Sequence, residues 1–414
     1  MKLQRQLVFF YFSRFLGLAL KPFTLWCALT FHSDTSSEFF AKLFFLVPAT
    51  FNIFNNDSHI GYYKTSFGGM SLPQGVGFRF RTYLNDFFSH SLLFSVPLFL
   101  FFALYFKKPI PAFLFLLFTL HEKFFDEVLR YQLFAKRYDV WAKCFLIKAG
   151  LPLGALILSV VWPRLSSSLS YATLILLGTT LVTKGLFSPR VFHFIKHVFV
   201  VAARRRLSQY AKAYRDRYLV NQLATLCAVN LISVDKWVGS HLWDPRTLGE
   251  VVLATQFGSI YLVIIDNFFF TTNRDRYVKN SATLIDVISW KKLGGLTVIL
   301  LTGYWGSLTL VKPLLGFRTL STVIIISIFL ISILKGISRP LEEYVFWHYS
   351  RASALVIDAS CLILTFFIGK ICFSVTEPLF IYLTVLGGSL FRLSCYWLLT
   401  RKSEKGLVVA NEVA

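Results

Sequence analysis

The chain has 414 residues, of which 55% are hydrophobic and 15% are charged, and its formal net charge is +22. Soluble domains are about 25% charged, so this composition excludes a mainly soluble protein and indicates a polytopic membrane protein. Lys and Arg hold loops on the cytoplasmic side and meet anionic lipid there, which explains the positive charge without nucleic acid as a partner.

Apolar stretches of about 20 residues recur along the chain, each long enough to cross the hydrocarbon core of a bilayer. The first has a basic start and no cleavage signal, so we expect a retained span rather than a signal peptide. The pattern predicts twelve helical spans, at residues 8–31, 38–60, 86–106, 110–131, 140–162, 168–188, 218–240, 248–270, 281–311, 319–338, 352–371 and 376–399.

Basic residues are distributed unevenly between the loops. With the N-terminus inside, the inside loops carry about three times as many Lys and Arg as the outside loops. Both termini are therefore predicted to be cytoplasmic. The longest inside loop, 189–217, alternates apolar and basic residues at helical spacing, which predicts an amphipathic helix along the inner leaflet.

Two weak internal similarities suggest a repeat. SEFFAKLFF at 37–45 resembles GEVVLATQF at 249–257, and residues 126–147 resemble residues 342–363 at nearly the same offset. Transporters commonly contain such repeats. The predicted fold is therefore all-α, with about 12 transmembrane helices in two six-helix lobes. The predicted domains are an N-lobe at 1–200, a basic cytoplasmic linker at 201–217 and a C-lobe at 218–414.

The segment HEKFFDEVLRYQLFAKRYDVWAK, residues 121–143, places many charges where a span should end. On a helix Glu122, Asp126 and Arg130 share one face, and Lys123 and Glu127 form a second pair. Charges at bilayer depth are costly unless they are paired or hydrated, so this stripe is expected to face a hydrated cavity. The alternative is a helix that ends near residue 121 and is followed by a solvated turn.

Other charges in apolar segments make the N-terminal half basic. Arg14 and Lys21 lie two turns apart on one helical face, and Lys148 lies in the fifth span. Clustered Arg and Lys in a low-dielectric setting favour phosphate or pyrophosphate. The candidate anion site is therefore Arg14, Lys21, Arg130 and Lys148. Structural ion pairs and snorkelling are the alternative explanation for any single charge.

The sequence offers little enzymatic chemistry. It contains no P-loop, HExxH or GxSxG motif and no metal-spaced His and Cys set, so no metal or cofactor is expected. Asp34 with Glu38, and Asp244 with Glu250, are possible surface pairs, and a catalytic role for them is disfavoured. The glycine pairs at 68–69, 294–295 and 387–388 are expected to be close-packing or hinge positions.

The chain resembles the Wzx-type polysaccharide flippases of the MATE-like MOP superfamily. The resemblance lies in the layout of spans, in residues 121–152 and in VDKWVGSHLWDPRTLGEVVLATQFGSI at 234–260. It implies a monomeric transporter of a bacterial inner membrane that flips undecaprenyl-pyrophosphate-linked oligosaccharides by alternating access, among membrane lipids and alongside a polysaccharide polymerase and chain-length regulator. The residues expected to serve in H⁺ or Na⁺ coupling, or in ion pairs, are His121, Glu122, Asp126, Asp235 and Lys236.

Two other functions stay open at this point. The first is an ion-coupled exporter of cationic drugs with the same fold, whose cavity should be acidic and aromatic. The second is a membrane polymerase or glycosyltransferase that acts on the same lipid-linked sugar.

Overall fold

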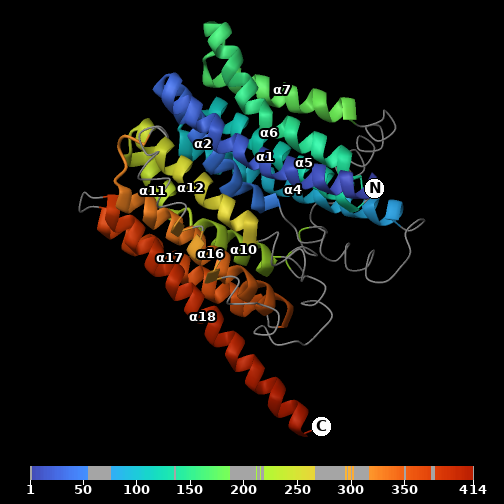
Figure 1. Cartoon of the computed structure of the whole chain (residues 1–414), viewed down its shortest axis with the longest axis vertical. Helices are drawn as coiled ribbons and strands as arrows, with labels where there is room; N and C mark the ends of the chain where they lie inside the picture. Colours follow the sequence, from blue (N-terminus) through green and yellow to red (C-terminus); the bar gives the residue numbers. More distant parts are fainter. Residues whose placement is uncertain are drawn as a thin grey trace. The chain divides into compact units, whose positions relative to one another are not determined.

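The computed structural model of the chain is built from α-helices (Figure 1). It describes residues 2–54, 76–134, 137–186, 219–265, 317–348, 351–373 and 378–413, with short pieces at 211, 215, 294–295, 297–299 and 301–302. The described residues form α1 (Lys2–Phe31), α2 (Asp34–Thr50), η1 (Phe51–Phe54), α4 (Val76–Phe106), α5 (Pro109–Phe134), α6 (Tyr138–Val161), α7 (Ser168–Leu186), α10 (Leu219–Leu231), α11 (Val234–Leu242), α12 (Pro245–Ile265), α16 (Thr322–His348), α17 (Arg351–Phe373) and α18 (Pro378–Val413).

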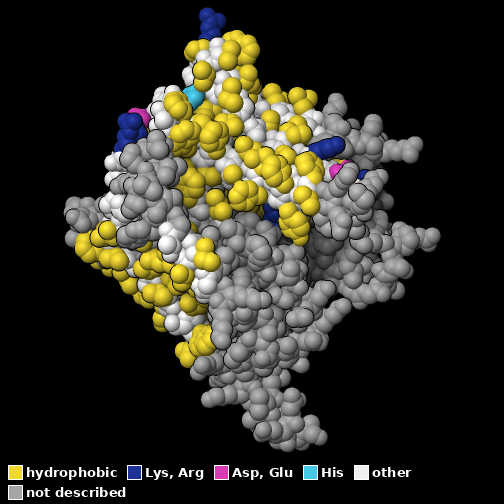
Figure 2. Space-filling model, in the orientation of Figure 1, with side chains coloured by type: hydrophobic (Ala, Val, Ile, Leu, Met, Phe, Trp, Pro, Cys, Tyr) yellow, Lys and Arg dark blue, Asp and Glu magenta, His cyan; other side chains and the backbone are white. Residues whose placement is uncertain are grey.

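These helices confirm the predicted all-α polytopic membrane fold. Six described helices are long and apolar enough to cross a membrane, and they coincide with predicted spans one, two, three, five, eleven and twelve. Helices α5, α7, α12 and α16 coincide with four further predicted spans. Hydrophobic side chains cover much of the described surface in Figure 2, as expected of helices that face lipid.

The seventh span differs from its prediction as one helix over 218–240. The chain forms a 13-residue α10 and a nine-residue α11, separated at Ile232 and Ser233. The hydroxyl of Ser233 donates a hydrogen bond to the Val229 carbonyl, and Lys236 Nζ donates one to the Ile232 carbonyl. Polar side chains thus satisfy backbone groups that the break releases, which is how a broken helix persists inside a membrane.

The first part of the charged segment, residues 121–134, lies in helix α5. It continues without interruption from Pro109 to Phe134, so the alternative of a helix that ends near residue 121 is wrong. Residues 121 to 134 are therefore helical, so side chains that are three or four residues apart lie on the same face.

The chain divides into two compact units. One contains Met1–Thr24 and Lys42–Leu226, and the other contains Leu25–Ala41 and Cys227–Ala414. The domain bounds expected from the sequence stay a prediction. The predicted amphipathic helix at 189–217, the ninth span at 281–311 and the glycine pair at 68–69 lie outside the described residues, apart from the short pieces named above.

An aromatic cluster holds three helices of the first unit together. Phe10 of α1 lies 4.5 Å from Trp141 of α6, and Trp141 stacks on Phe145 at 4.7 Å between ring centroids. Phe125 and Leu129 of α5 complete the buried cluster. A Cβ atom at Gly17 of α1 would overlap the Phe145 ring, so glycine is needed for this close approach.

In the second unit α16 and α17 both pack against α18. Small residues allow the approach. A Cβ atom at Gly258 of α12 would overlap Ser332 of α16, and one at Gly388 of α18 would overlap the hydroxyl of Thr365 on α17. Association of helices in lipid depends on such small residues, because lipid tails are as apolar as the side chains they would replace.

Candidate functional site

The aromatic cluster of the first unit places three charged side chains on facing helices. Phe10, Gly17 and Lys21 share one face of α1, because they are seven and four residues apart. Trp141, Phe145 and Lys148 also share one face of α6, with spacings of four and three residues. Glu122, Phe125 and Leu129 share one face of α5, with spacings of three and four. Packing at one end of these faces therefore brings Lys21, Glu122 and Lys148 together at the other. We call these three residues the charged cluster.

The centre of the charged cluster is an ion pair between α5 and α6. Lys148 Nζ lies 2.7 Å from Glu122 Oε1, and the two side chains are 15% and 31% exposed. The same ammonium lies 4.9 Å from the centroid of the Phe125 ring. The pair is thus only partly buried by protein.

Lys21 adds a second cation to this pair. Its ammonium interacts electrostatically with both Glu122 and Lys148. It makes no hydrogen bond or ion pair within the described part of the chain. The charged cluster therefore combines two amino groups with one carboxylate, and its formal net charge, with both lysines protonated, is +1. His121, next to Glu122, stacks on Phe125 at 6.3 Å and interacts with the same charges.

A separate set of charges, centred on Lys123, lies beside Glu122 on α5. Lys123 Nζ lies 2.8 Å from Glu127 Oε1, and both side chains are 1% exposed. Asp126 also pairs with Lys123, at 3.4 Å, so it does not simply continue a stripe from Glu122. The cation lies over the Phe51 ring at 5.6 Å. Lys123 is held on two carboxylates and an aromatic face, which suits a structural role.

Arg14 and Arg130, the other two residues predicted for the anion site, are not part of the charged cluster as the structure describes it. Arg14 lies in α1, one helical turn before Gly17, and is partly exposed. Arg130 lies in α5, but its side chain is outside the described part of the structure. Of the four predicted anion-binding residues, the structure thus brings Lys21 and Lys148 together.

Asp235 and Lys236 lie in the second unit, in the first turn of α11. Lys236 Nζ donates hydrogen bonds of 3.0 and 3.1 Å to the two carboxylate oxygens of Asp235. Both residues are buried. Trp237 donates a hydrogen bond of 2.6 Å from Nε1 to Asn230 Oδ1, which connects α11 to α10 across the break.

A second buried network joins α16, α17 and α18. Arg392 Nε donates a hydrogen bond of 2.6 Å to Asp358 Oδ1, and a terminal guanidinium nitrogen of Arg392 contacts Glu342 and the Ser338 hydroxyl. Tyr396 donates a hydrogen bond to the other Asp358 oxygen. The sequence marks Asp358 and Arg392 as charges in apolar spans, but their pairing could not be found without the packing of the helices.

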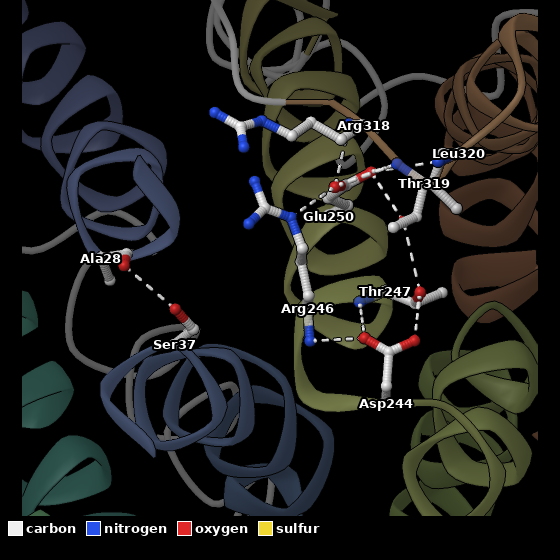
Figure 3. A network of polar contacts seen from close by, with 9 residues as sticks. All are labelled: Ala28, Ser37, Asp244, Arg246, Thr247, Glu250, Arg318, Thr319 and Leu320. Carbon is white, nitrogen blue, oxygen red and sulfur yellow. Dashed lines mark hydrogen bonds and ion pairs between the residues drawn. The ribbon is translucent and has the colours of Figure 1, made fainter. Parts of the chain in front are cut away.

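Glu250 forms the centre of a third network, shown in Figure 3. Its carboxylate has no exposed surface, and it accepts hydrogen bonds from the backbone N–H groups of Arg318, Thr319 and Leu320 and from the Thr319 hydroxyl. Glu250 therefore fixes the segment that enters α16. Glu250 and Asp244, the possible surface pair, lie in one network, in which the hydroxyls of Thr247 and Thr319 connect their carboxylates.

Asp244 has its own role at the start of α12. It accepts hydrogen bonds from the backbone N–H groups of Arg246 and Thr247 and from the Thr247 hydroxyl (Figure 3). Burial by itself would raise the pKa of Asp244, but these hydrogen bonds outweigh burial and hold that pKa below its ordinary value. Asp244 is thus an N-terminal cap that works best as a carboxylate.

Comparisons with known proteins identify the fold. No protein-family model and no curated protein matches the sequence. The structure is similar to the inward-facing conformation of a multidrug resistance MATE family transporter of the MOP superfamily, with a TM-score of 0.57, 11% identity and coverage of 95% of both chains. It is also similar to the lipid II flippase MurJ in an inward closed conformation, with a TM-score of 0.54, 11% identity and coverage of 95% of this chain and 87% of MurJ. The chain therefore has the membrane fold that a MOP-superfamily transporter shares with a lipid flippase.

Proposed function

We propose that this protein is a transporter that flips undecaprenyl-pyrophosphate-linked oligosaccharides across a bacterial inner membrane, as the O-antigen and capsule pathways require. The observation that carries the proposal is the charged cluster, in which two lysines on membrane-spanning helices lie around one carboxylate. Charges at such a depth cost several kcal/mol, so an excess of cations there needs a function. The similarity of fold to a lipid II flippase supports the same conclusion.

The charged cluster would act on the diphosphate of the substrate. Lys21 and Lys148 would bind the phosphate oxygens, because ammonium groups bind phosphates as point charges. The polyprenyl tail would stay in lipid, against exposed apolar side chains such as Phe12 and Phe15 of α1. Alternating access would then expose the headgroup to each side of the membrane in turn. The step needs no covalent chemistry, and H⁺ or Na⁺ coupling through His121, Asp126 or Asp235 stays part of the proposal.

The proposed function also includes an oligomeric state, an orientation in the membrane and protein partners. We expect a monomer with both termini in the cytoplasm, acting beside a polysaccharide polymerase and a chain-length regulator. Orientation can be tested by attaching a reporter enzyme to each terminus. The partners can be tested by crosslinking in native membranes.

The decisive experiment is the sidedness of lipid-linked sugars in a strain that lacks the gene. A flippase predicts that single repeat units accumulate on the cytoplasmic face while surface polysaccharide disappears. Repeat units that reach the outer face but stay unpolymerised would instead identify a polymerase. Product formation by the purified protein from a sugar donor would identify a glycosyltransferase.

A drug exporter is the second candidate, because the fold is also that of a multidrug resistance transporter. A site for cationic drugs needs carboxylates that are free to receive the drug. Among the described residues of the second unit, Asp235 is paired with Lys236 and Asp358 with Arg392, and Glu250 is held by backbone N–H groups. These pairs favour the flippase. Drug sensitivity of the same strain, without loss of surface polysaccharide, would favour the exporter.

A further inference from the structure

The cation Lys148 already has an anion bound to it. The carboxylate of Glu122 lies 2.7 Å from the ammonium, at the distance of a charge-assisted hydrogen bond. Lys21 interacts electrostatically with the same carboxylate and has no closer partner among the described residues. Glu122 therefore occupies the position that an anionic ligand of Lys21 and Lys148 would need.

Glu122 differs from the other carboxylates on the same helix. Glu127 is 1% exposed and is fixed to Lys123, whereas Glu122 is 31% exposed. A partly exposed glutamate can turn toward water at little cost once another anion replaces it, because its charge is then hydrated rather than buried.

We infer that Glu122 is an internal counter-ion that a diphosphate must displace from Lys148 and Lys21. This inference rests on the proposed function, because it assumes that the charged cluster is where the headgroup binds. A carboxylate neutralises one of the two lysines, whereas a diphosphate carries enough charge to neutralise both. A tethered carboxylate also competes at an effective concentration on the order of millimolar or higher. Glu122 thus sets a threshold that favours multiply charged headgroups over single carboxylates.

The test is the affinity of the purified full-length protein for inorganic pyrophosphate, measured by calorimetry. Glu122→Gln removes the competing charge and keeps the side-chain shape, so pyrophosphate should bind about 10-fold more tightly, which corresponds to about 1.4 kcal/mol. Lys148→Gln should weaken binding by a similar factor or more. Elution profiles and melting temperatures establish that each variant is folded.

Two further variants separate contact from general charge. Asp139→Asn removes a partly exposed carboxylate in the first turn of α6, outside the charged cluster, and it should change the affinity less than about 3-fold, well below the effect of losing a charged hydrogen-bond partner. Glu122→Asp keeps the charge but shortens the side chain, so it should also bind pyrophosphate more tightly. Glu122→Asp alone decides the question if Glu122→Gln does not fold.

Each result has a separate meaning. If Glu122→Gln and Glu122→Asp bind like the wild type while Lys148→Gln binds weakly, the anion site stands and the counter-ion role is overturned. Weaker binding by Glu122→Gln would show that Glu122 positions the lysine, which also overturns the role. If neither the wild type nor the Glu122 variants bind pyrophosphate, the charged cluster is not the headgroup site, and the proposed function loses its main support along with this inference.

Discussion

Gly387 and Gly388 are adjacent in α18, yet they should respond differently to alanine. A Cβ atom at Gly388 would overlap the hydroxyl of Thr365 and lie 3.3 Å from its Cβ and 3.5 Å from its Cγ2. Rotation of the Thr365 side chain can move the hydroxyl, but it leaves the Thr365 Cβ at 3.3 Å, which is closer than an ordinary contact. A Cβ atom at Gly387 meets no atom within 4 Å. Gly387→Ala is thus a matched control for Gly388→Ala.

The magnitude follows from two opposing effects. Alanine stabilises a helix interior by up to about 1 kcal/mol relative to glycine, and this gain is shared because both positions are in the same helix. Overpacking costs about 1–3 kcal/mol and applies at Gly388 alone. The free energy of unfolding should therefore be lower for Gly388→Ala than for Gly387→Ala by about 1–3 kcal/mol.

The free energies can be measured by titrating the purified protein with SDS in mixed micelles. Thr365→Ala should restore much of the loss in Gly388→Ala, because it removes the hydroxyl and methyl groups in the way. The Thr365 hydroxyl makes no hydrogen bond within the described residues, so its removal alone should cost little polar energy. Equal unfolding curves for the two glycine variants, or no rescue by Thr365→Ala, would refute the packing argument.

Three further predictions concern buried or capping charges. Arg392→Met leaves Asp358 buried without its cation and should lower the free energy of unfolding by about 3–5 kcal/mol in the same SDS titration, whereas the exposed Lys370→Met should change it by less than about 0.5 kcal/mol. Glu250→Gln should speed hydrogen exchange of the backbone amides of 318–320, because an amide side chain offers one acceptor oxygen in place of two. Unchanged exchange would contradict the role of Glu250 in fixing this segment. Because its folded pKa is lowered, Asp244 should contribute stability above about pH 4 that is lost as the pH falls through that pKa, and the melting temperature of Asp244→Asn should lack this acid-dependent loss.

Hydropathy and charge spacing were sufficient to predict most helices, because a span in lipid must satisfy its backbone hydrogen bonds internally and is therefore usually a continuous apolar helix. The seventh span shows the limit of this reasoning. Its residues are apolar enough for one helix, and the break at Ile232 depends on a lysine that donates to a released carbonyl. Such compensation involves particular side chains and does not alter the hydropathy of the segment.

The candidate site was predicted in part for a similar reason. Helical spacing within one helix predicts pairs such as Lys123 with Glu127, which the structure contains. It cannot predict which helices face each other. Pairing of Glu122 with a cation of the anion site was therefore an expectation without a chosen partner, and the contacts of Arg392 were not expected. The signal that was available in the sequence was the excess of single charges in apolar spans, because a charge that stays in a membrane must have a partner.

The charges in this bundle can be separated by how completely their partners satisfy them. Glu250 receives hydrogen bonds on both carboxylate oxygens and has no exposed surface, and Arg392 contacts two carboxylates and a hydroxyl. Displacing either would leave a buried charge uncompensated, so both suit fixed architecture. The charged cluster has two cations for one partly exposed anion. A ligand with more negative charge than Glu122 can therefore neutralise the two lysines more completely. Among the charged groups of the described residues, the charged cluster is therefore the one best suited to bind an anionic substrate.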